Sequence, residues 1–190
     1  GEIYLDSSPI SNNHTGIFKM SDDHGATWFG GSSDDGSLGH ANSTDGDGYY
    51  FIPDAVWNDL VATQFNYEYV DDCDGTSEFI DSFWSYYEDD FKVDREGNTH
   101  WAIQVMGCGL DFCYYVPESG IYHFTIDRDN LDNPGPVNTS TGWNWSFVMT
   151  GNDTWGWADM TGDTYIWDNH ASLAFSTQNR DIVYVATNLA

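Results

Sequence analysis

An internal repeat restricts the fold of this chain more than any other feature. Residues Gly16–Asp23 recur as Gly120–Asp127, 104 positions later (120 minus 16), and both copies follow the pattern Gly-Ile-aromatic-x-apolar-Ser/Thr-x-Asp. The first copy closes with Gly25–Trp28. The second reaches Gly142–Trp145 after 13 additional residues, because its Asp-to-Gly spacing is 15 positions instead of 2. A pattern that recurs within one chain indicates a repeated structural unit, whereas an active site is normally present once.

Short aromatic and β-branched runs along the chain predict β-strands, and the clusters of Gly, Asp, Asn and Ser between them predict turns. The expected strands are Glu2–Leu5, Gly16–Met20, Tyr49–Ile52, Phe91–Asp94, Trp101–Met106, Cys113–Val116, Ile121–Ile126, Ser146–Met149 and Ile182–Ala186. Helical turns are compatible only with Pro53–Thr63 and Ser77–Tyr87, and the second segment is nearly as compatible with an aromatic strand. We therefore predict an all-β fold.

The chain is strongly acidic, with 31 Asp and Glu against 5 Lys and Arg and a formal net charge of −26. Binding to nucleic acid requires Lys and Arg that neutralise phosphates, and anionic membranes attract basic segments, so both partners are excluded. Aromatic residues make up 17% of the chain, which argues for a packed fold because disordered acidic segments lack them. No apolar run approaches the roughly 20 residues of a membrane-spanning helix, so we expect no membrane insertion.

Five Asn-x-Ser/Thr triplets suggest an extracellular or cell-surface location, because this composition would give roughly two by chance and such triplets are the acceptors of N-glycosylation. The candidate glycosylation sites are Asn13, Asn42, Asn138, Asn144 and Asn152. An Asn- and Thr-rich loop composition is the alternative explanation of the excess.

Three cysteines allow at most one intramolecular disulfide. Cys108 and Cys113 bracket four residues and would face each other across a short hairpin, with Cys73 left over; three reduced thiols are the alternative. The chain has no C-x-x-C pair, and the spacing of His100 and His123 is not that of zinc ligands.

Three segments resemble a known family. Residues Ser21–Trp28 resemble the Asp-box, Ser/Thr-x-Asp-x-Gly-x-Thr-Trp, the repeat signature of sialidase-like β-propellers. Residues Asp94–His100 resemble the Asp-x-x-Gly-Asn-x-His turn of large secreted bacterial surface propellers, and Ser172–Thr187 are similar to the first two strands of their blades. The resemblance covers about half of the chain, and residues 30–90 match no segment of the family.

This resemblance implies β-propeller-like blades of short antiparallel strands within one segment, 1–190. The blade-like units would be about 1–30, 91–150 and an incomplete 151–190, with 31–90 unassigned. A chain that begins and ends inside a blade is expected to be an incomplete propeller: a fragment of a longer polypeptide, or else one that pairs its two ends.

The box residues are expected to hold the blade. Asp and Ser/Thr side chains bond turn backbone groups, Gly25 supplies an unusual conformation, and Trp28 would be buried between sheets. The two copies of the box are Ser21, Asp23, Gly25 and Trp28, and Thr125, Asp127, Gly142 and Trp145. Trp143 and Trp145 lie on one face of an expected strand, where they would pack between blades or, if exposed, stack on sugar rings.

Catalysis by this segment is not favoured. Sialidase chemistry needs several arginines that clamp a carboxylate and a Tyr nucleophile with a partner Glu, whereas the chain has only Arg95, Arg128 and Arg180, each in or beside an expected turn. Calcium is the expected cofactor, because clustered oxygen ligands follow the second box. They are Asp127, Asp129, Asn130 and Asp132, and solvated acidic turns are the alternative.

The sequence therefore predicts an extracellular, non-catalytic β-propeller segment in adhesion, recognition or surface assembly, with calcium and N-linked glycans as expected additions. Its partner would be a glycan or protein at the cell surface, or the rest of a longer polypeptide. The alternatives are part of a carbohydrate-active hydrolase whose catalytic residues lie partly outside the segment, and a structural subunit of an extracellular assembly.

Overall fold

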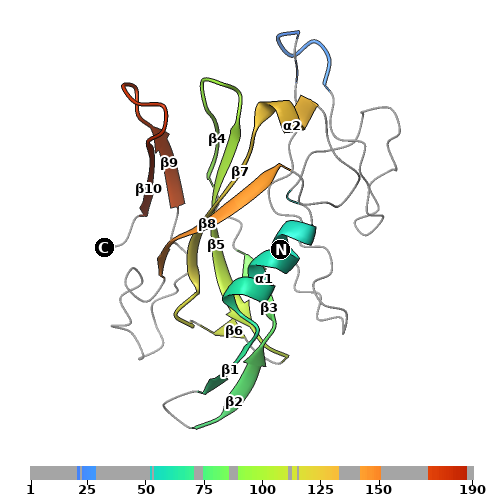
Figure 1. The fold of residues 1–190 in the computed structure, drawn as a ribbon, viewed down its shortest axis with the longest axis vertical. Helices are drawn as coiled ribbons and strands as arrows, with labels where there is room; N and C mark the ends of the chain where they lie inside the picture. Colours follow the sequence, from blue (N-terminus) through green and yellow to red (C-terminus); the bar gives the residue numbers. More distant parts are fainter. Residues whose placement is uncertain are drawn as a thin grey trace.

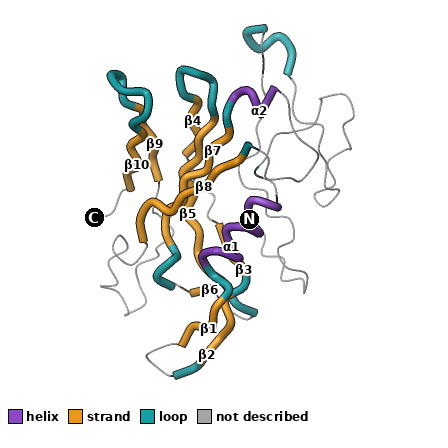
Figure 2. Tube along the Cα trace, in the orientation of Figure 1, coloured by secondary structure: helices purple, strands orange, loops and turns teal. Residues whose placement is uncertain are grey.

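The computed structural model describes residues 21, 23–28, 52, 54–70, 75–85, 90–110, 113–114, 116–132, 142–150 and 171–187. Two helices lie within them, α1 (Asp54–Gln64) and α2 (Arg128–Asp132). The strands are β1 (Tyr67–Val70), β2 (Ser77–Ile80), β3 (Ser82–Ser85), β4 (Asp90–Val93), β5 (Thr99–Cys108), β6 (Cys113–Tyr114), β7 (Gly120–Ile126), β8 (Trp143–Thr150), β9 (Ala171–Phe175) and β10 (Val183–Thr187). Figures 1 and 2 show these elements along the chain.

The central feature is a six-stranded antiparallel sheet built around β5. One edge of β5 pairs with β7 and, at its end, with β6; the other edge pairs with β4 and then β3. Strand β8 continues the sheet beyond β7. Strands β4, β5, β7 and β8 are therefore neighbours in space in the order in which they follow along the chain.

Helix α1 covers one face of this sheet, as Figure 2 shows. Val56, Trp57, Leu60 and Val61 are buried, and their spacing forms one apolar helix face. The ring of Trp57 stacks on Phe83 with 4.5 Å between centroids. The core of the molecule lies between this helix and the sheet.

The β9–β10 hairpin packs on the opposite face, where Ala171 and Leu173 meet Ala102 and Ile121. Asp90 fixes its position by accepting a hydrogen bond from the Leu173 N–H at 2.7 Å. Partial burial raises the pKa of Asp90, but the bonds from Leu173 and Lys92 outweigh it and lower that pKa overall. Covered on both faces, β5 is buried over its whole length, as expected for a strand without polar alternation.

The predicted all-β class is confirmed. Strands lie at or beside six of the expected positions, from Phe91–Asp94 to Ile182–Ala186. Helix α1 begins within Pro53–Thr63 and extends one residue beyond it, and the described part of Ser77–Tyr87 holds strands β2 and β3 rather than helix. The expected strands Glu2–Leu5 and Gly16–Met20, and all of Tyr49–Ile52 except Ile52, lie outside the described residues.

Within the described residues, the strands form three separate sheets and no closed barrel or propeller. No described helix is long and apolar enough to cross a membrane.

Candidate functional site

The first Asp-box forms a turn held by its own side chains. The Asp23 carboxylate accepts hydrogen bonds from the Thr27 hydroxyl at 2.6 Å, the Thr27 N–H at 2.8 Å and the Ser21 hydroxyl at 2.9 Å. The Gly25 N–H donates to the Ser21 oxygen at 2.7 Å. The bonds from Thr27 are the main reason that the pKa of Asp23 falls to about 2. This carboxylate is occupied within its own turn.

The burial expected for Trp28 is wrong, because 60% of this side chain is exposed. Its ring lies over its own turn, 3.6 Å from the position that a Cβ on Gly25 would take. Gly25 has φ of 88°, in the left-handed region, which explains why the turn uses glycine there.

The second copy of the box runs from the end of β7, through the connection, to the start of β8, and it is built differently. Thr125 donates its hydroxyl to the Thr99 carbonyl on β5 at 2.9 Å. The Asp127 carbonyl accepts from the Asn130 N–H at 3.1 Å as α2 begins, and Trp145 donates to Asp59 at 2.8 Å. The 13-residue insertion explains the difference, because it separates Asp127 from Gly142 and fills the gap partly with α2.

The two tryptophans of β8, Trp143 and Trp145, are half-buried and pack against the core under α1. Of their two expected roles, they therefore serve packing. A second pair at the same spacing, Trp155 and Trp157, lies outside the described residues.

The predicted calcium site remains a prediction. Asp127 and Asp129 are exposed and Asn130 is half-buried, while the side chain of Asp132 lies outside the described residues. Within the part of the chain that the structure describes, no three His, Cys, Asp or Glu side chains are grouped so that they could hold a metal ion.

Cys108 is disulfide-bonded, and the register of β5 and β6 places Cys113 directly opposite it. This arrangement agrees with the predicted pairing, although the Cys113 side chain and Cys73 lie outside the described residues. Of the candidate glycosylation sites, Asn144 is exposed on β8. The other four, Asn13, Asn42, Asn138 and Asn152, lie outside the described residues.

The β4–β5 turn forms a densely hydrogen-bonded polar cluster. The Asp94 carboxylate accepts bonds from the N–H groups of Glu96 and Asn98 at 2.8 and 2.9 Å and from the Asn98 amide at 2.8 Å. Partial burial raises the pKa of Asp94, but these bonds outweigh it and keep that pKa below its ordinary value. Gly97 has φ of 90°, and the Asn98 oxygen accepts the Arg128 N–H at 3.0 Å, so the turn is tied to α2.

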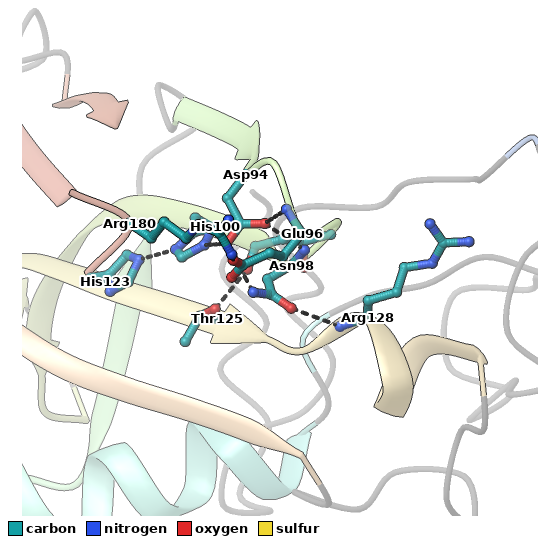
Figure 3. Close-up of polar contacts among 9 residues, drawn as sticks. Asp94, Glu96, Asn98, His100, His123, Thr125, Arg128 and Arg180 are labelled. Atoms are coloured by element: carbon teal, nitrogen blue, oxygen red, sulfur yellow. Dashed lines mark hydrogen bonds and ion pairs between the residues drawn. The ribbon is translucent and has the colours of Figure 1, made fainter. Parts of the chain in front are cut away.

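Two histidines continue this cluster on the face that the β9–β10 hairpin covers. His100 Nδ1 lies 2.9 Å from His123 Nε2, and His100 Nε2 lies 3.4 Å from the Asp94 carboxylate. Figure 3 shows His100 between the other two side chains. Burial lowers the pKa of His100 even though Asp94 raises it, and burial with the neighbouring His100 lowers the pKa of His123 to about 4. Both imidazoles are therefore neutral at pH 7.

This pair was not predicted from the sequence, which indicated only that the spacing was wrong for zinc. A usable signal exists in the motifs themselves. His100 ends the Asp94–His100 turn, and His123 occupies the variable position of the second repeat copy. Once β5 and β7 are known to pair with Ala102 opposite His123, both rings lie on the same face.

A second polar cluster lies at the opposite end of β7. Tyr67 donates its hydroxyl to the Glu118 carboxylate, and Tyr122 donates to the Glu118 carbonyl, each at 2.6 Å. Burial and the charge of Glu118 raise the pKa of both tyrosines. Such phenols stay protonated at neutral pH and are not activated as nucleophiles.

Among the described residues, no arginine clamp of the kind that sialidase chemistry would require forms at the histidine pair, although Arg128 and Arg180 both bond to the β4–β5 turn. Arg180 pairs with Glu96 at 2.6 Å in an exposed position, and Figure 3 shows Arg128 extending away from the histidine pair. Comparisons of the chain with models of protein families, curated proteins and solved structures gave no match.

Proposed function

We propose that this chain is a segment of an extracellular Asp-box β-propeller that serves in adhesion, recognition or surface assembly rather than in catalysis. The observation that carries the proposal is the order of β4, β5, β7 and β8, four antiparallel neighbours that follow one another along the chain apart from the two-residue β6, with a box copy at their last connection. Four such strands are what a propeller blade contains.

The β9–β10 hairpin supports the same proposal. It begins after the four-stranded unit, contains the segment that resembles the first two strands of a blade, and packs its apolar side on the face of that unit. Blades of a propeller bury their faces against one another in this way. Residues 91–150 and 171–187 would then belong to consecutive blades.

The chemistry of three of the described carboxylates supports a non-catalytic role for them. A general acid at neutral pH needs a raised pKa, whereas Asp23, Asp90 and Asp94 all have lowered pKa values because they accept hydrogen bonds. Each of them holds a turn or a strand in place.

The expected partners follow from the charge and the location. A segment with net charge −26 disfavours acidic partners and attracts cations, so we propose a neutral glycan or a protein at the cell surface, or the rest of a longer polypeptide. Glycosylation at Asn144 and calcium at the α2 loop belong to the same proposal.

A paired screen of the full chain tests this function. An array of immobilised glycans should show binding, while a panel of chromogenic glycosides should show no turnover. The folded Asp23→Ala variant should keep its binding, as should the control Asp181→Ala, which changes an exposed aspartate in the β9–β10 turn. Turnover of any glycoside, or loss of binding in Asp23→Ala with an unchanged melting temperature, would favour the hydrolase alternative.

A further inference from the structure

The His100–His123 pair lies beneath the β9–β10 hairpin. His100 is only 8% exposed, and its ring meets the Phe175 ring edge-on, with 4.8 Å between centroids. The β9–β10 hairpin therefore covers the His100 imidazole and excludes water from it.

The contact between the two imidazoles is a directed hydrogen bond. The ring planes differ by only 16°, and the ring centroids are 5.1 Å apart. The two nitrogens are 2.9 Å apart. Adding the distance from each centroid to its own nitrogen gives nearly the full separation of the centroids. The two nitrogens therefore point at each other along one line. Such a contact needs one N–H and one lone pair.

The carboxylate of Asp94 sets the direction of this bond. An ionised carboxylate only accepts, so His100 Nε2 carries a proton toward Asp94 and His100 Nδ1 is left as an acceptor. His123 Nε2 then donates to it. In the neutral state, both hydrogen bonds are donated in the same direction, from His123 to His100 and from His100 to Asp94.

The groups around the pair come from every element that packs against it. They are Asp94 and Glu96 in the β4–β5 turn, Asp90 and Lys92 on β4, Asp127 after β7, Arg128 on α2, and Arg180 and Asp181 in the β9–β10 turn. Lys92 pairs with Asp90, and Arg180 pairs with Glu96. Asp94 is the carboxylate within reach of an imidazole nitrogen among the described residues.

We propose that the His100–His123 pair is an acid-sensitive latch that holds the β9–β10 hairpin on the sheet and releases it when both rings are protonated. The pair can take up one proton from solvent and keep both hydrogen bonds. His100 is then an imidazolium that donates from Nε2 to Asp94 and from Nδ1 to His123 Nε2, and His123 carries its proton on Nδ1. The second proton places N–H against N–H and two positive charges side by side. The rings then separate, and hydration of both requires the hairpin to move away.

The sign of the effect follows from the lowered pKa values. A histidine whose folded pKa is depressed binds fewer protons in the closed state than in the open one, so closure is favoured above the ordinary value of 6.5 and lost as pH falls toward about 4. Opening of the hairpin should therefore increase between pH 7 and pH 4. This latch does not depend on the proposed recognition role.

Hydrogen exchange on the full chain, corrected for the intrinsic pH dependence of exchange, tests the latch. In the wild type, opening at the amides of Val183–Thr187 should rise about tenfold or more between pH 7 and pH 4.5, while the amides of β5 and β7 stay protected. His123→Gln keeps one donor and one acceptor at every pH and leaves only His100 to titrate, so the opening of its hairpin should depend much less on pH than in the wild type. His24→Gln, which changes an exposed histidine in the first box, should behave like the wild type.

Nitrogen-15 spectra of the wild-type imidazoles provide the second measurement if His123→Gln does not fold. At pH 7 they should show a proton on His100 Nε2 and on His123 Nε2. The latch would be overturned if hairpin opening in the wild type did not change with pH, or if its pH dependence were the same in His123→Gln. It would also be overturned if this pH dependence disappeared only in Asp90→Asn.

Discussion

The turns around Asp23 and Asp94 use the same scheme in different surroundings. In each, one carboxylate accepts two bonds from residue i+4, at its backbone N–H and its side chain, and a glycine adopts a φ near 90°. The first turn is exposed and bonds mainly to itself. The second is linked to α2 through Asn98, to β5 through His100 and to the β9–β10 turn through Glu96.

The second box copy, Thr125–Trp145, shows that a similar motif can form a different structure. It repeats the residue pattern of the first box, but Thr125 bonds to a neighbouring strand and Asp127 lies at the start of α2. The spacing between Asp and Gly thus decides whether the turn forms, because one carboxylate spans only a few residues. Similar motifs can form different structures, and different motifs, at Asp23 and Asp94, can form the same one.

The largest expected effect is that of removing the Asp94 carboxylate. Asp94→Ala leaves the N–H groups of Glu96 and Asn98 and the His100 Nε2–H without their acceptor, so we expect a loss of about 2–3 kcal/mol in the free energy of unfolding, measured by urea denaturation at pH 7. Asp94→Asn retains an acceptor oxygen and should lose less. If Asp94→Ala lowered the free energy of unfolding no more than Asp23→Ala does, the contacts that link the Asp94 turn to its surroundings would add nothing to stability.

Much of this architecture is predictable from local patterns. Strand positions follow from aromatic and β-branched runs, and the resemblance of Asp94–His100 to a turn and of Ser172–Thr187 to two blade strands anticipates the β4–β5 and β9–β10 hairpins. The polar cluster is predictable only in part. Asp94–His100 was recognisable as a turn, but contact between His100 and His123 depends on the register of two strands 23 positions apart, which no local pattern specifies.

The exposure of Trp28 was not predictable from the motif either. A Trp in a box can be buried only if another sheet lies against it, and this depends on packing between distant segments. In contrast, Trp145 reaches the core because α1 covers β8. Burial is a property of the surroundings, whereas the turn itself is a property of the residues.

The next effect compares the two turn glycines. Gly97 and Gly25 have φ values of 90° and 88°, so an alanine at either costs about 1–2 kcal/mol of backbone strain. A Cβ at Gly97 would also lie 2.8 Å from the Arg128 Cδ, whereas at Gly25 the nearest atom is 3.6 Å away. Thermal unfolding should show Gly97→Ala to be the more destabilising change, and Gly97→Ala,Arg128→Ala should remove the excess. Equal losses for the two single variants would contradict this.

A smaller effect is expected where the second box departs from the first. Thr125→Val keeps the shape of the side chain but removes the bond to the Thr99 carbonyl, so we expect a loss of about 1 kcal/mol in chemical denaturation. In the first box, Thr27→Val removes the bond from the Thr27 hydroxyl to Asp23 and should instead raise the pKa of Asp23 from about 2 toward 3.8, as NMR titration would show. An unchanged stability in Thr125→Val would contradict a stabilising role for the bond to the Thr99 carbonyl.

The smallest effect is that of the ion pair between the β4–β5 and β9–β10 turns. Arg180 and Glu96 are 79% and 48% exposed, and exposed pairs of this kind contribute about 0.2–1 kcal/mol and are screened by salt. Arg180→Ala should therefore lower the melting temperature only slightly at low ionic strength and not at all at high salt. Glu96→Gln is the matched control and should have the same effect, because either change removes the same pair. A destabilisation by Arg180→Ala that persists in high salt would mean that the side chain packs against the hairpin, which would extend the link between the two turns beyond charge.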